Sequence, residues 1–68
     1  MTKDEAIAEI VENCVEAVRD EPEDFYDVEE IRGWIIDTLV DNDDCYPVEW
    51  HSAMVPICYD RVMTILKS

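Results

Sequence analysis

The fold is decided first by residues 2–20, TKDEAIAEIVENCVEAVRD, which carry the start, the buried face and the length of a helix. Thr2 and Glu5 have the spacing of a capping box, in which Thr2 caps the first turn and Glu5 bonds back to it. Pro22 is expected to end the helix, because the residue before a proline avoids the α region. Apolar residues recur at helical spacing and predict one buried face: Ile7, Ile10, Val11, Cys14 and Val18.

A second helix is expected after a connecting loop at residues 23–26. Asp27 predicts its N-cap, with Glu30 three residues on as the reciprocal partner. The run DNDD at residues 41–44 predicts its end, since these residues favour turns. The expected apolar stripe of this helix is Val28, Ile31, Ile35 and Leu39.

The C-terminal region is also expected to be helical. Pro47 suits the first helical position, and Pro56 either kinks this region or starts a further helix. Its apolar residues share one face: Met54, Val55, Cys58, Val62, Ile65 and Leu66. Residues 1–68 are therefore predicted to form a single acidic helical domain, an all-α bundle of three to four helices.

The composition supports this class. Hydrophobic residues make up 49% of the 68 residues, which is too many for a disordered acidic tail. One glycine and three prolines favour long helices over a β fold with many turns. Three cysteines with no Cys-x-x-Cys spacing indicate reduced thiols, and no segment reads as a signal peptide or a membrane span. We expect a cytoplasmic protein that does not bind membranes.

The charge is strongly asymmetric. The chain has 18 aspartates and glutamates but only five lysines and arginines, which gives a formal net charge of -13. Of the acids, only Asp60 lies beyond residue 50. Such self-repulsion does not stabilise a fold. Anionic lipids, DNA and RNA would be repelled, so a cationic protein is the partner class that the charge favours.

The acids of the first helix form a row, which we name the acidic stripe: Glu5, Glu9, Glu12, Glu16 and Asp20. At about 100° per residue they fall within roughly 80°, opposite the apolar face. With a rise of 1.5 Å per residue they span about 22 Å, or roughly one charge per 5 Å. One strand of B-DNA carries about one phosphate per 3.4 Å. The stripe is thus predicted to imitate a phosphate backbone.

The second helix repeats the pattern more weakly. Asp27, Glu30, Asp37 and Asp41 project to one side, and Trp34 lies beside the last three. A tryptophan bordered by carboxylates is a candidate hot spot for a protein interface, stacking on an arginine of the partner. The alternative is that Trp34 packs under the Phe25–Tyr26 loop.

No catalytic or metal site is predicted. Asp41, Asp43 and Cys45 resemble the first positions of a calcium loop, but the central glycine and the final glutamate are missing. Cys45, His51 and Cys58 do not have the spacing of a zinc site. Nothing singles out a pair of acids for acid–base chemistry, so we expect neither an enzyme nor a cofactor.

Residues 30–55 contain a pattern of an acid with an aliphatic residue opening a helix, an Asp-Asn end, and then Pro-x-x-aromatic before another apolar helix. This stretch of about 25 residues, with one gap, resembles the Ocr-type phage antirestriction proteins, which are acidic helical mimics of B-DNA. The resemblance implies that Glu30 and the Asp41-Asn42 helix end belong to a mimic surface, and that Pro47 and Trp50 are markers of the fold. It also implies a homodimer. The chain is shorter than that family and lacks its long acidic C-terminal tail.

These observations lead to one functional hypothesis and one alternative. The hypothesis is a non-enzymatic inhibitor, encoded by a phage and acting in the host cytoplasm, that blocks the basic nucleic-acid-binding site of a host defence protein. The alternative is a small helical interaction module that binds through an apolar or tryptophan surface. In that case the acids provide solubility or salt adaptation.

Overall fold

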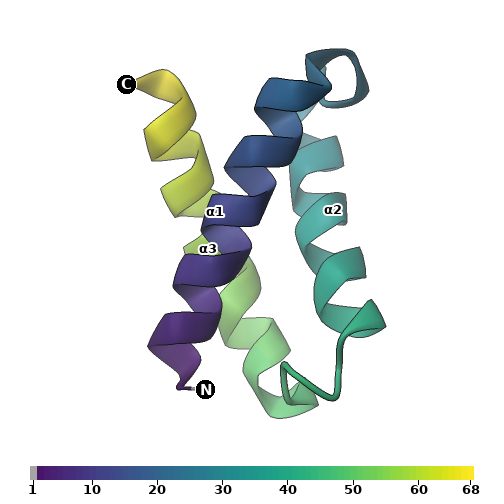
Figure 1. Ribbon diagram of the computed structural model, residues 1–68, viewed down its shortest axis with the longest axis vertical. Coiled ribbons are helices and arrows are strands. Elements are labelled where there is room, and N and C mark those ends of the chain that lie inside the picture. Colours follow the sequence, from purple (N-terminus) through teal and green to yellow (C-terminus); the bar gives the residue numbers. More distant parts are fainter. Residues whose placement is uncertain (1) are drawn as a thin grey trace.

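The computed structural model describes residues 2–68 and contains three α-helices joined by short connections (Figure 1). α1 spans Lys3–Asp20, the 3₁₀ turn η1 spans Pro22–Asp24, α2 spans Val28–Asp41 and α3 spans Val48–Lys67. Figure 1 shows α1 in front of α3, with α2 beside them. The predicted all-α class is confirmed, and the described residues hold three α-helices rather than four.

The N-terminus of α1 is fixed by the predicted capping box. The Thr2 N–H donates to Glu5 Oε1 over 3.0 Å, and the Glu5 N–H donates to Thr2 Oγ1 over 3.2 Å. The helix ends at Asp20, before Pro22, as predicted. Val18 is only half-buried, whereas the fully buried face includes two residues that the pattern missed, Ala6 and Val15: Ala6, Ile7, Ile10, Val11, Cys14 and Val15.

The start of α2 differs from the prediction in two respects. Asp27 is the N-cap, but its carboxylate accepts from the N–H of Glu29 over 3.1 Å, and the reciprocal pair with Glu30 is not the capping contact. Val28 is 44% exposed and is not part of the core, because it lies on the row of α2 that also exposes Arg32, Ile36 and Val40. Ile31, Ile35 and Leu39 are buried as predicted.

α3 continues through Pro56 as one helix of 20 residues, with Pro47 as its N-cap. Proline removes one backbone hydrogen bond of a helix. On either side of Pro56, however, Met54, Cys58 and Val62 recur every four residues and are fully buried. Their burial in one core stabilises a continuous helix. The C-terminal helix therefore supplies core residues to the fold.

Gly33 is the only glycine of the chain and lies in the middle of α2. Its φ is not positive, so the backbone conformation there does not require glycine. A Cβ at this position would meet nothing within 4 Å, so packing does not require glycine either. A glycine inside a helix costs about 0.5–1 kcal/mol relative to alanine. The fold alone thus gives no reason for Gly33.

The connection between α2 and α3 is attached to α1 by Tyr46. This buried side chain donates its hydroxyl to Glu9 Oε1 over 3.0 Å. His51 Nε2 lies 2.7 Å from the backbone oxygen of Tyr46, and the nitrogen must donate because a carbonyl only accepts. Together, the two hydrogen bonds hold the turn before α3 against α1.

Three buried groups predict that the fold is sensitive to alkaline pH. Burial raises the pKa of Cys14 and of Cys58 to about 11, and burial together with the Glu9 hydrogen bond raises the pKa of Tyr46 to about 12. The unfolded chain releases these protons near pH 9 to 10 and the folded chain retains them. The stability that these three groups contribute should therefore be fully present below about pH 8 and should be lost as pH rises toward 12.

Urea denaturation at pH 8 and at pH 11 measures this loss. Tyr46→Phe should cost about 1 kcal/mol at pH 8 through the lost hydrogen bond. It should also lose less stability than wild type between pH 10 and 12, because one titrating group is gone. An unfolding midpoint that is the same at both pH values would contradict the prediction.

Candidate functional site

All five residues of the acidic stripe are exposed on α1, opposite its buried face. Two of them are also tied to the fold. Glu5 forms the capping box, and the hydrogen bonds with Thr2 lower the pKa of its carboxyl. Glu9 accepts a hydrogen bond from the hydroxyl group of Tyr46. Glu12, Glu16 and Asp20 complete the row toward the C-terminal end of the helix.

The predicted acids of α2 divide into two groups. Glu30, Asp37 and Asp41 are all exposed. Glu30 and Asp37 line a concave site together with Trp34, whereas Asp41 lies outside it at the end of the helix. Asp20 of the acidic stripe lines the same site. The structure therefore brings four predicted residues together from two helices.

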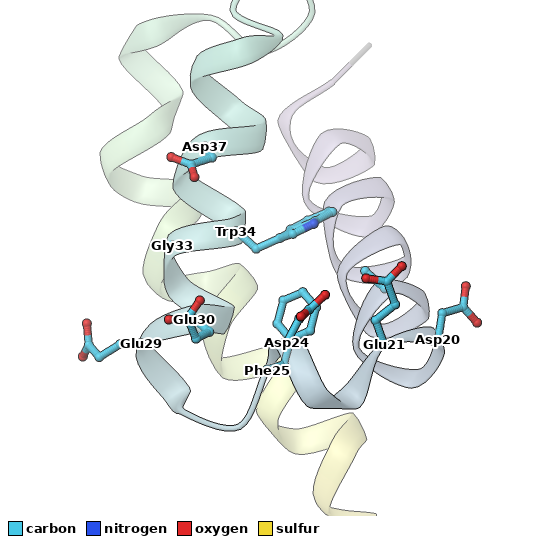
Figure 2. Close-up of a pocket in the computed structure, with 10 residues that line it drawn as sticks. Asp20, Glu21, Asp24, Phe25, Glu29, Glu30, Gly33, Trp34 and Asp37 are labelled. Atoms are coloured by element: carbon cyan, nitrogen blue, oxygen red, sulfur yellow. The ribbon is translucent and has the colours of Figure 1, made fainter.

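The site, which we name the acidic pocket, is an open cavity of about 690 Å³ between the end of α1, η1 and the Glu29–Asp37 part of α2. In Figure 2 the Trp34 ring extends from α2 toward α1, and the ring of Phe25 lies near it. Six of its ten lining residues are acids and none is a base: Ala17, Asp20, Glu21, Asp24, Phe25, Glu29, Glu30, Gly33, Trp34 and Asp37.

Trp34 is neither freely exposed nor covered by the whole Phe25–Tyr26 loop. The ring is half-buried and packs against the core, and it lines the pocket with Phe25. Tyr26, by contrast, is 83% exposed and does not cover it. Trp34 therefore presents an aromatic surface within a ring of carboxylates, while part of it stays anchored.

Six lining residues were not among the predicted site residues: Ala17, Glu21, Asp24, Phe25, Glu29 and Gly33. The signal available was the acidic connection after α1, which carries Glu21, Glu23, Asp24 and Asp27 without a base. A hydrogen bond with Asp24, and then repulsion from Asp24, Glu23 and Asp20, raise the pKa of Glu21. The crowding of like charges at this end of α1 makes a cation favourable there.

His51, Cys14 and Cys58 are tied to the fold, whereas Cys45 is exposed. His51 donates to the Tyr46 carbonyl, and burial keeps the Cys58 thiol protonated at neutral pH because its pKa is about 11. Cys14, Cys45 and Cys58 are free thiols. Within residues 2–68 no three His, Cys, Asp or Glu side chains are grouped so as to hold a metal ion. Over the same residues, no helix has the length and apolar character needed to cross a bilayer.

The acidic residues are distributed unevenly over the three helices. α1, α2 and their connection hold most of the acids, whereas α3 carries two acids, Glu49 and Asp60, against two bases, Arg61 and Lys67. The molecule is thus acidic on two helices and nearly neutral on the third. Comparison with protein family models, with curated proteins and with solved structures found no match to this chain.

Proposed function

We propose that the chain is a non-enzymatic inhibitor that imitates the phosphates of a nucleic acid and occupies the basic nucleic-acid-binding site of a host protein. The observation that carries the proposal is the acidic stripe, five exposed carboxylates in one row along an 18-residue helix. Asp20 joins this row to the acidic pocket, so the acidic surface continues onto α2.

The energetic cost of the surface supports a role in binding. Like charges at i,i+4 each destabilise a helix by a few tenths of a kcal/mol, and Glu5, Glu9, Glu12, Glu16 and Asp20 make several such pairs. A surface that only provided solubility would intersperse bases, as α3 does with Arg61 and Lys67. Opposite charge also steers association, and a basic groove is the complement of this surface.

The biological setting that we propose is the inhibition of a host defence system by a phage protein. An inhibitor of an antirestriction or anti-CRISPR kind acts in the host cytoplasm and needs no catalytic site. A homodimer would lengthen the acidic surface, and light scattering of the purified protein measures that state directly.

The proposal predicts a salt-dependent partner that releases its nucleic acid. Immobilised protein is incubated with host lysate at about 0.1 M salt, where charges interact over about 10 Å, and is then eluted up to 1 M salt, where the range is about 3 Å. We expect a nucleic-acid-binding protein to elute, and its DNA or RNA to compete with the inhibitor. The proposal would be contradicted if the partner stayed bound at 1 M salt. It would also be contradicted if the partner bound the inhibitor and its nucleic acid at the same time.

One observation favours a second candidate, an interaction module that binds through an apolar face. Val28, Arg32, Ile36 and Val40 follow one another every four residues along α2, and all four are exposed. Such a row suits an apolar partner. In the same capture experiment this module would retain its partner at 1 M salt, because screening does not weaken apolar contact.

A further inference from the structure

Gly33 is explained by the acidic pocket rather than by the fold. Neither its φ nor its packing requires glycine, and the residue weakens α2. It lines the pocket beside Trp34, and the space where its Cβ would be is open. Gly33 stands between Glu30 and Asp37 on one face of α2, so its missing side chain leaves that part of the pocket lining open. A ligand that approached the backbone of α2 would account for this glycine.

The lining determines the chemistry of that ligand. Carboxylates come from α1, η1 and α2, and two aromatic rings, Phe25 and Trp34, are interleaved with them. Carboxylates select a cation, and an aromatic face attracts a cation further, most strongly at tryptophan. A volume of about 690 Å³ is in the range of pockets for organic ligands. The ligand is thus an organic cation with a flat face.

We propose that the acidic pocket receives an arginine side chain of the basic partner. The guanidinium is planar, so it stacks on Trp34 while its edge donates to carboxylates such as those of Glu30 and Asp37. Lysine carries the same charge, but it neither stacks in this way nor donates to a carboxylate in a bidentate manner. This inference rests on the proposed function, which supplies the basic partner, and adds the residue that anchors it.

Two peptides separate an arginine site from general attraction to the acidic surface. Fluorescein-labelled Lys-Lys-Arg-Lys-Lys and Lys-Lys-Lys-Lys-Lys have equal charge, and anisotropy measures the affinity of each for the intact protein. We expect the arginine peptide to bind roughly tenfold more tightly, because stacking on a partly desolvated ring adds to the charge attraction. Equal affinities for the two peptides overturn the inference.

Gly33→Ala is the sharpest variant. The new methyl group fills open space in the pocket, so the preference for arginine should fall from roughly tenfold to less than about threefold. The thermal midpoint should stay the same or rise by a few degrees, because alanine favours the helix. A more stable protein with a weaker preference supports the site. A preference that is unchanged in Gly33→Ala overturns it.

Asp37→Asn and Asp41→Asn form a matched pair. Each removes one charge from α2, but only Asp37 lines the pocket. Asp37→Asn should reduce the arginine preference, whereas Asp41→Asn should weaken both peptides equally. Equal effects of the two variants on the preference overturn the inference. The proposed function fails separately if the captured partner stays bound at 1 M salt while the protein still prefers the arginine peptide.

Discussion

Leu39→Ala is expected to unfold most of the protein at 25 °C. Leu39 is 0% exposed and packs in the core between α2 and the other helices. Truncating a buried leucine costs about 2–5 kcal/mol. A single core in a domain of this size rarely supplies more than about 3–5 kcal/mol. Circular dichroism in a urea titration measures the loss.

The neighbouring residue provides the control. Val40 follows Leu39 on the same helix and is 58% exposed, so Val40→Ala should change the free energy of unfolding by less than about 0.5 kcal/mol. Both variants remove aliphatic carbon from one turn of α2. Similar losses from the two variants would mean that the buried face of α2 has been placed wrongly.

Glu12→Lys combined with Glu16→Lys is expected to weaken binding of the captured partner by roughly a hundredfold or more at about 0.1 M salt. Both carboxylates are exposed in the middle of the acidic stripe. Each reversal replaces an attraction to a basic groove with a like-charge contact, which costs several kcal/mol at an interface. Biosensor measurements at low and high salt should show the difference shrinking as salt screens the charges.

Glu9 is left out of this variant because Tyr46 donates to it, so its reversal would also disturb the fold. The control is Glu49→Lys with Asp60→Lys, which changes the net charge by the same amount on exposed sites of α3. We expect that control to lose less than about tenfold in affinity, through the long-range field alone. Equal losses from the two double variants would show that net charge, and not the stripe, determines binding.

The parts of the fold that could be predicted are those with local causes. The capping box of Thr2 and Glu5 and the end of α1 before Pro22 depend on residues within one turn of each other. Pro56 left two possibilities open, because a rule about proline does not weigh the burial of Met54, Cys58 and Val62 on both sides of it. Val28 fits the period of its helix, but the period does not tell which edge of the apolar stripe another helix covers.

The candidate site was predictable only within single helices. The side of α2 that carries Glu30, Trp34 and Asp37 follows from helical spacing. The pocket itself needs the path of the connection, which turns at η1 and places Asp24 and Phe25 beside α2. The role that we propose for Gly33 could not be predicted from the sequence. A glycine within a helical pattern only indicates a weaker helix, and the open space beside it is visible only in the structure.

The three thiols differ in exposure, and this difference can be used to measure how often the helices separate. Cys45 is exposed in the connection after α2, whereas Cys14 and Cys58 are buried on α1 and α3. An alkylating reagent should therefore modify Cys45 at once and reach the other two only when the helices separate. Since opening events of this kind occur with a free energy up to that of global unfolding, the rate of the slow alkylation measures how often the molecule opens under native conditions. The same reactivity allows one dye to be attached at Cys45 without any substitution.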